Sequence, residues 1–205
     1  IQFYSEEDLL PVFGPFWSKE LLRMAYGEDS GTLQLTEREL PHMKSVGRSV
    51  TGYQLCRNKD IVRMVLLNLI EEVTHKTRQM GLAGRFVWVG LNGHDQYWSA
   101  HRTLQYHIRH TSEMFDLIYH ELYSQIEKPF PIIKFAVRLG MLKQVEKTPL
   151  PLFGNWQKQE KLSASLDAIT EKYGLFTVKP ASLMSHKIIR PEVTGFLGDR
   201  QYYGL

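Results

Sequence analysis

The chain has 205 residues, of which 43% are hydrophobic and 23% are charged, and its net charge is +3 at neutral pH. These proportions are those of an ordinary globular protein of one or two domains, which argues against collagen-like, coiled-coil, low-complexity and disordered classes. Charge is uneven, because residues 44–143 hold fourteen Lys and Arg against eight Asp and Glu, whereas residues 1–43 hold three against eight. A polyanion is one explanation of that basic region, and an ordinary solvated surface is another.

The first predicted element is a short helix over residues 16–24. Pro15 stands near its start, and Gly27 marks its end. Residues 28–41 carry Gly31, scattered charge and only weak alternation, which indicates a linker into a second domain.

Four strands and two helices follow. The predicted strands are residues 44–52, 85–91, 98–107 and 131–142. Asp60 is the predicted cap of the first helix and Gly81 its stop, and Thr111 is the predicted cap of the second. Apolar residues at helical spacing are Val62, Val65, Leu69, Val73 and Met80 in the first helix and Met114, Ile118, Leu122 and Ile126 in the second.

The order strand, helix, strand, strand, helix, strand predicts an α+β fold of the split βαβ (βαββαβ) type. Its four-stranded antiparallel sheet carries both helices on one face and leaves the other face free. The alternating row Ser45, Gly47, Ser49 and Thr51 would let a phosphate backbone approach closely. In the last strand, Lys134 and Arg138 fall on the face opposite the apolar residues. Free sheet faces also bind protein or nothing, so the pattern alone leaves these possibilities open.

The C-terminal part begins with the isolated apolar pentapeptide PLPLF, residues 149–153. Such a segment is typical of a motif that docks into a partner's pocket, although packing against the next helix explains it equally well. That helix is predicted over residues 157–173, with Gly174 as its stop. The tail, residues 185–205, gives no prediction.

Four stretches in order resemble a known family. FGPFWSKELLRMAYGEDSG (residues 13–31) resembles the last thumb helix, and KSVGRSVTG (44–52) the first little-finger strand, of Y-family DNA polymerases. GRFVWVGL, WSAHRTL and PIIKFAVRLGML resemble the rest of that domain, and PLPLFGNWQKQEKLSASLDAITEKYG (149–174) resembles a clamp-binding loop and its following helix. The chain is thus similar to the C-terminal part of the UmuC/DinB superfamily, particularly its UV-damage-repair branch. The implied domains are a thumb end and linker (1–43), a little finger (44–143) and a clamp-motif region (144–205).

The resemblance implies a domain that grips the phosphates of template–primer duplex DNA during translesion synthesis in DNA repair and the SOS response. The implied DNA contacts are Lys44, Ser45, Gly47, Arg48, Ser49, Arg102 and Thr103. Binding through phosphates is tolerant of sequence and strongly dependent on salt. Alternation places Arg102 on the apolar side, so a structural role beside a carboxylate such as Glu72 is the alternative there.

The resemblance also implies a sliding clamp as partner. The family's motif is Gln-Leu-x-Leu-Phe, and Leu150, Leu152 and Phe153 match it, while Pro149 replaces the Gln. We expect this replacement to weaken clamp binding, because a polar contact is lost.

Polymerisation in this family uses palm-domain carboxylates that hold two metal ions, and no matched stretch contains them. We therefore expect no catalytic residue, metal site or cofactor in this chain, with Mg²⁺ expected only alongside a palm domain. Whether the chain is part of an enzyme stays open at this point. We expect a monomer on DNA.

Two alternatives compete with DNA binding. His101, His107, His110 and His120 fall within twenty residues, but no carboxylate or Cys accompanies them at a recognised metal-binding spacing, so exposed histidines are favoured. The second alternative is a protein-interaction module of split βαβ type that uses PLPLF and does not bind DNA.

The location is predicted from composition. Cys56 is the single cysteine, so no internal disulfide forms and a reducing compartment is expected. No apolar run approaches the ~20 residues of a membrane-spanning helix, and no basic, apolar leader opens the chain. The start at Ile1 suggests part of a longer protein. We expect a cytoplasmic protein without membrane contact.

Overall fold

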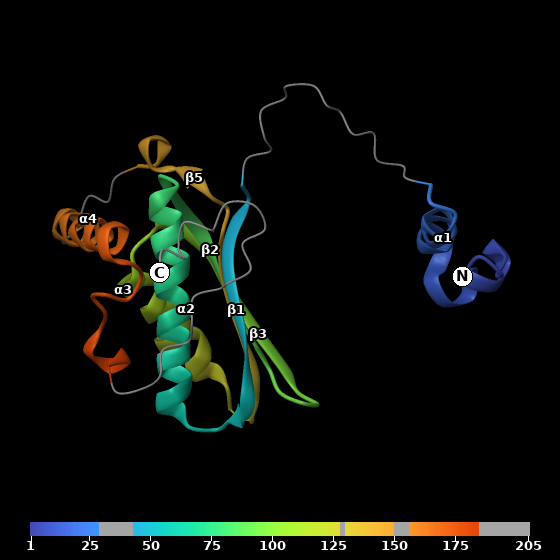
Figure 1. Cartoon of the computed structure of the whole chain (residues 1–205), viewed down its shortest axis with the longest axis horizontal. Coiled ribbons are helices and arrows are strands. Elements are labelled where there is room, and N and C mark those ends of the chain that lie inside the picture. The colour runs from blue at the N-terminus through green and yellow to red at the C-terminus, as the bar shows by residue number, and fades with distance from the viewer. Residues whose placement is uncertain (29–42, 128–129, 150–155, 185–205) are drawn as a thin grey trace. The chain divides into compact units, whose positions relative to one another are not determined.

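The computed structural model describes residues 1–28, 43–127, 130–149 and 156–184 (Figure 1). The chain divides into two compact units, Ile1–His42 and Met43–Leu205. The expected three domains, divided after residues 43 and 143, stay a prediction. Within the described ranges, every helix is too short or too polar to cross a bilayer.

The first unit contains helix α1, Glu6–Ala25, which begins ten residues earlier than the helix predicted from the sequence. A capping box causes the early start: Ser5 accepts a hydrogen bond from the backbone of Asp8, and the Asp8 carboxylate accepts one from the backbone of Ser5. Gly14, at φ +74°, kinks the helix directly before Pro15, so Pro15 starts a second helical segment. The sequence prediction found only that second segment.

The second unit contains the sheet and its helices. In chain order they are β1 (Ser45–Cys56), α2 (Lys59–Gln79), β2 (Leu82–Asn92), β3 (Tyr97–Ile108), α3 (Thr111–Phe115), the π-helix η1 (Asp116–Leu122), the 3₁₀ turn η2 (Tyr123–Gln125), β4 (Ile132–Gly140), β5 (Lys143–Gln144), the 3₁₀ turn η3 (Val145–Lys147), α4 (Trp156–Tyr173) and the 3₁₀ turn η4 (Ala181–Leu183). The four long strands and the helices confirm the α+β fold of the split βαβ type.

The sheet order is β1-β4-β2-β3, and every neighbouring pair is antiparallel. The last long strand therefore lies between β1 and β2, the two strands that α2 connects. The short strand β5, which the sequence prediction lacked, pairs with the start of β2. β4 has strands on both sides, so its side chains sit at the middle of the sheet.

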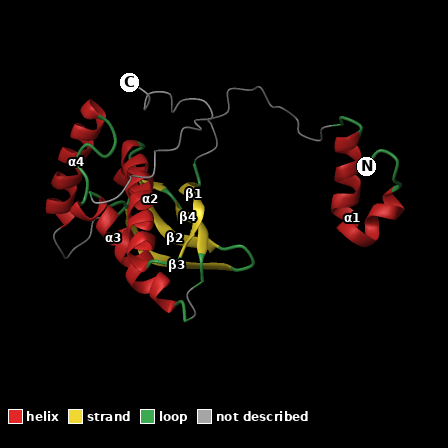
Figure 2. Cartoon of the chain, turned by 60° about the horizontal axis from the view of Figure 1, so that its bottom comes forward, coloured by secondary structure: helices red, strands yellow, loops and turns green. Residues whose placement is uncertain are grey.

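The core lies on one face of this sheet, under α2, α3 and η1. In Figure 2 these red helices gather on one side of the yellow strands. The fully buried core residues come from the helices and from the strands. They include Val62, Leu66, Leu69, Ile70 and Val73 of α2, Met114 of α3, Ile118 of η1, and Val87, Val89, Leu91, Val137 and Leu139 of the strands. Removing this much apolar surface from water is the main force that closes the helices onto the sheet.

Two predicted caps are wrong. The side chain of Asn58, not Asp60, caps α2, because its Oδ1 accepts from the Asp60 backbone at 2.8 Å. His110 holds the cap position of α3, and the Thr111 hydroxyl instead donates to Glu71 Oε2 at 3.0 Å and lies 2.8 Å from the Thr74 hydroxyl. Thr111 is therefore the first residue of α3, and its side chain joins α3 to α2 rather than capping the helix.

Helix α4 packs on the helical layer, and none of its residues is fully buried. Asp167 attaches it to α2: Arg78 donates to the two carboxylate oxygens at 2.7 and 2.8 Å, and His75 Nδ1 donates to Oδ1 at 2.8 Å. Near the helix start, Glu160 pairs with Arg109. Polar contacts thus hold this helix in place more than apolar burial does.

Candidate nucleic-acid interface

The sheet face opposite the helices is built as a regular grid. Strand pairing puts four residues from each long strand on this open face, because directly opposed residues of antiparallel strands share a face. Its four rows are Ser45, Gly140, Phe86, Thr103; Gly47, Arg138, Trp88, His101; Ser49, Ala136, Gly90, Ser99; and Thr51, Lys134, Asn92, Tyr97. These sixteen residues are called the open face below.

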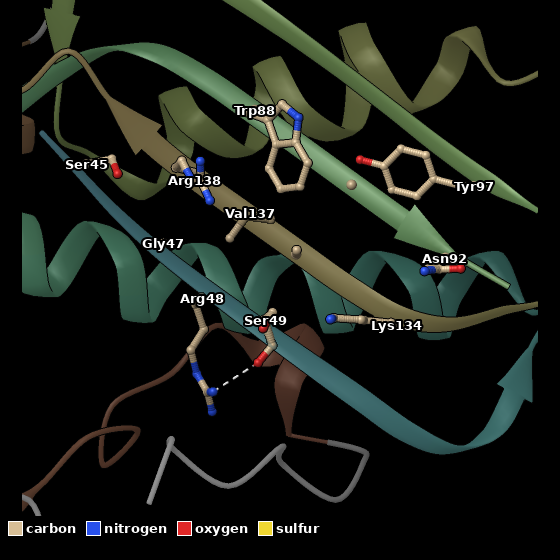
Figure 3. Close-up of a pocket in the computed structure, with 12 residues that line it drawn as sticks. Ser45, Gly47, Arg48, Ser49, Trp88, Asn92, Tyr97, Lys134, Val137 and Arg138 are labelled. Carbon is tan, nitrogen blue, oxygen red and sulfur yellow. Dashed lines mark hydrogen bonds between the residues drawn. The ribbon is translucent and has the colours of Figure 1, made fainter. Parts of the chain in front are cut away.

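The open face carries positive charge at its centre. Arg138 and Lys134 are exposed on β4, and four residues of strand place them roughly 13 Å apart. No residue of the grid is a carboxylate. A depression of about 510 Å³ lies over this part of the sheet, and its lining includes Arg138, Lys134 and small residues of β1 (Figure 3). Two separated cations without a competing anion suit a polyanion that lies along the sheet.

Glycine keeps the open face free of projecting side chains along β1. The aliphatic part of the Arg138 side chain lies against Gly47. A Cβ added at Gly47 would be 3.5 Å from the Cβ of Arg138 and 3.1 Å from the carbonyl oxygen of Val137. Along β1 the neighbours of Gly47 in the row are Ser45 and Ser49, so no large side chain rises from that strand. A phosphate backbone can then approach the cations of β4 across β1.

Some of the DNA contacts predicted on the first strand lie on this face. Ser45, Gly47 and Ser49 are exposed there, opposite Gly140, Arg138 and Ala136 of β4. Lys44 is exposed and immediately precedes β1. Contact between these residues and DNA stays a prediction.

Arg48 points to the other side of the sheet. Its Nε donates to Glu72 Oε2 of α2 at 2.6 Å, and the two side chains are only 9% and 10% exposed. Asn68 donates to the second oxygen of the same carboxylate at 3.0 Å. In Figure 3 the Arg48 side chain leaves β1 away from Arg138. The guanidinium therefore joins β1 to α2, and its predicted role as a DNA contact would require it to leave Glu72.

The two DNA contacts predicted on β3 are adjacent residues, so their side chains lie on opposite faces of the sheet. Arg102 lies opposite Val87, on the helix side, and forms an ion pair with Glu121 of η1. The alternative considered for it, a carboxylate partner, therefore describes the structure, but the partner is Glu121 and not Glu72. Thr103 lies opposite Phe86, on the open face, and is exposed.

The remaining predicted sites are placed as follows. Leu150, Leu152 and Phe153 lie outside the described residues. Among the residues that the structure describes, no group of three or more His, Cys, Asp and Glu is arranged to hold a metal ion. Burial lowers the pKa of His107, and the charges of Arg85 and Lys143 lower it further, so this histidine is neutral at pH 7.

The structure adds residues that the site prediction lacked, namely Arg138, Lys134, Trp88 and Tyr97. The sequence of β4 alternates, which places Lys134 and Arg138 on the face opposite the apolar side chains. This alternation was the signal in the sequence that could have identified them as site residues. No comparable signal existed for Trp88, because β2 is apolar on both faces in the sequence.

Comparison with known proteins agrees with this architecture. Residues 43–152 match the impB/mucB/samB family C-terminal domain. The chain belongs to this family. The matched region is the little-finger domain of Y-family DNA polymerases, and it contains all four long strands together with α2, α3 and η1.

The curated relatives are bacterial polymerases. DNA polymerase IV of Pelotomaculum thermopropionicum is 26% identical over 153 residues, which are 74% of this chain and 38% of that protein. DNA polymerase IV 2 of Halalkalibacterium halodurans is 28% identical over 179 residues, which are 80% and 43%. DNA polymerase IV of Acetivibrio thermocellus is 26% identical over 176 residues, which are 83% and 44%. The chain spans less than half the length of these relatives, and membership of the UV-damage-repair branch stays a prediction.

Proposed function

We propose that this little-finger region holds template–primer duplex DNA for a translesion polymerase through the open face of its sheet. The observation that carries this proposal is the pair of exposed cations, Arg138 and Lys134, on the central strand of a face without carboxylates. The hydroxyls of Ser45 and Ser49, the low backbone at Gly47 and the charge of Lys44 complete a phosphate-binding surface. Thr103 extends it onto β3.

The proposed contacts act on the sugar–phosphate backbone and read no bases. A polymerase must move along any template, and phosphate contacts fix the position of a duplex without reading its sequence. Nucleotide addition itself would take place on palm carboxylates and two Mg²⁺ ions elsewhere in such an enzyme. We assign the DNA-gripping role to this chain and propose that it acts in DNA damage bypass.

The test is fluorescence anisotropy of the whole chain with a labelled blunt duplex across a salt series. We expect a steep loss of affinity with salt, the same for two unrelated sequences. Replacing both Arg138 and Lys134 by Ala should lower the slope of log K against log salt by about 1.8, because each lost phosphate contact contributes roughly 0.9. Lys161→Ala, an exposed cation on α4, is the matched control and should leave the slope unchanged.

Absence of duplex binding at low salt would contradict the proposal and favour the protein-interaction module instead. An unchanged slope in the double variant, with wild-type binding intact, would show that another surface holds the DNA. Arg48→Ala tests separately the DNA contact predicted at Arg48, because this residue lies on the helix side and pairs with Glu72.

A second proposed partner is a sliding clamp, on the strength of Leu150, Leu152 and Phe153. Two Leu and a Phe at this spacing are suited to an apolar pocket, and Pro149 supplies no polar contact beside them. In a pull-down with a bacterial clamp, the double change Leu152→Ala and Phe153→Ala should abolish retention. Equal retention of the variant and the unchanged chain would contradict clamp binding through this motif.

A further inference from the structure

The open face also carries aromatic side chains, and phosphate binding does not explain their presence. Phe86 and Trp88 come from β2. On β3, His101 lies opposite Trp88, and Tyr97 lies opposite Asn92, farther along β2. Tyr97 is 64% exposed, and the rings of Phe86 and His101 lie 5.3 Å apart at an interplanar angle of 31°. Aromatic surface left in contact with water on a charged sheet face is typical of a binding surface.

Trp88 lies flat on the sheet because of Gly90. A Cβ on Gly90 would fall 2.7 Å from Cζ2 of the indole, closer than real side chains approach. Gly90 is itself buried although it belongs to the open face, which shows that the indole covers it. One side of the ring therefore rests on the strand, and a neighbour without a side chain is what permits this.

The flat indole stands next to Arg138. The guanidinium of Arg138 is 5.5 Å from the centre of the Trp88 ring, within the range of a cation–π interaction. Trp88 and Arg138 are also directly opposed on β2 and β4. Figure 3 shows the two side chains beside one another, with Tyr97 farther along in the direction of Asn92. The guanidinium lies over the ring, so aromatic surface and phosphate-binding charge are neighbours on the open face.

This combination selects among possible occupants. A protein partner would be met by apolar side chains without the need for two cations, and a duplex offers phosphates but keeps its bases stacked inside. An unpaired stretch of DNA offers both groups, because its bases are free to stack on aromatic rings while its phosphates meet Arg and Lys. The absence of carboxylates from the grid favours the same anionic ligand.

We propose that Trp88, with Tyr97 farther along the same face, stacks an unpaired base of a DNA strand whose phosphates are held by Arg138 and Lys134. The ligand is the junction between a duplex and a single-stranded overhang, and the stacking is indifferent to which base is present. Stacking here rests on the DNA binding proposed above and adds a second kind of contact to the same face.

Three probes separate the two kinds of contact. They are a blunt duplex, the same duplex with a four-nucleotide overhang, and that duplex with the four overhang positions abasic, so that phosphates remain and bases are removed. For the whole chain we expect the overhang with bases to bind about tenfold more tightly than the abasic one. Indole fluorescence should be quenched by the first overhang and not by the second.

Two variants test the assignment to Trp88. Trp88→Leu keeps an apolar side chain on a face outside the core, and Gly90→Ala pushes the indole off the sheet without altering it. Each should reduce the tenfold preference to about twofold or less and remove the quenching, while binding of the blunt duplex keeps its salt slope. Trp156→Leu is the matched control, because Trp156 belongs to α4, which packs on the helical layer at the other side of the sheet.

Equal affinity for the two overhangs, or a preference that survives in Trp88→Leu, would overturn the stacking assignment and leave duplex binding intact. If the unchanged chain binds none of the three probes at low salt, the proposed function is overturned, and the stacking assignment with it. Quenching that persists in Trp88→Leu would place the base at another tryptophan and would also overturn the assignment.

Discussion

Arg48 and Arg138 show how position along a strand decides the role of a basic side chain in this sheet. Arg48 lies two residues from Val46 and two from Val50, so it shares their face of the strand, the helix side, and meets Glu72. Arg138 alternates with Val137 and Leu139, so it leaves toward solvent. The same residue type thus joins two layers in one strand and leaves its charge exposed in the other.

The Arg48 pair gives a prediction about stability. Arg48→Met should lower the free energy of unfolding by about 3 to 5 kcal/mol, because it removes the guanidinium that is bonded to the Glu72 carboxylate in a nearly buried site. Replacing both partners, Arg48→Met with Glu72→Leu, should restore most of that loss, since the buried charge is gone. Urea unfolding of the three proteins measures the effect. A double variant no more stable than Arg48→Met would show that the pair does not act as a unit.

At the scale of elements, α4 is the part whose attachment depends most on ionisation. Burial opposes the charge of Asp167, but hydrogen bonds from Arg78 and His75 outweigh burial and hold the pKa of its carboxyl well below the usual range. Glu71 lies near the same charges, and burial raises its pKa in spite of the hydrogen bond from Thr111. Asp167 is thus the anion that keeps α4 on α2 at neutral pH.

The consequence for pH follows from the direction of the shift. A carboxyl whose pKa is lower in the folded state stabilises that state at pH values above its unfolded pKa, near 3.9, and loses the contribution as the pH falls toward the folded value. Asp167→Asn should therefore cost about 1 to 3 kcal/mol at pH 7, and the cost should shrink below about pH 4. Urea unfolding of both proteins at pH 7 and pH 2.5 tests this. A cost that does not change with pH would contradict it.

The remaining elements show where sequence patterns suffice and where they do not. The four long strands, α2 and the free sheet face are predictable, because alternation and helical spacing record one-sided burial directly. The sequence prediction starts this helix at residue 16 because Pro15 favours a helix start, whereas the structure has an earlier start at Glu6 and a kink at Gly14. The π-helix η1 and strand β5 are set by packing against neighbours, which no local spacing records.

At the scale of the whole molecule, the candidate site was predicted only in part. Ser45, Gly47, Ser49 and Thr103 follow from alternation or from resemblance to the family. Arg138 and Lys134 become prominent only when pairing places β4 at the centre of the sheet, and Trp88 only when Gly90 is seen beneath it. Local pattern assigns a residue to a face, but the order of the strands decides which residues meet there.

The central claim is that DNA lies on the open face and not on the helices. Its most direct test is NMR of the ¹⁵N-labelled chain titrated with a blunt duplex, read at the amides of β1 and β4 and at two indole N–H signals. Trp88 and Trp98 come from adjacent strands but lie on opposite faces, Trp98 being packed against the core. We predict shifts at residues 45–51, Lys134, Arg138 and the Trp88 indole, with the Trp98 indole unchanged. Shifts concentrated on α2 and α4, with the Trp88 indole unmoved, would contradict the claim.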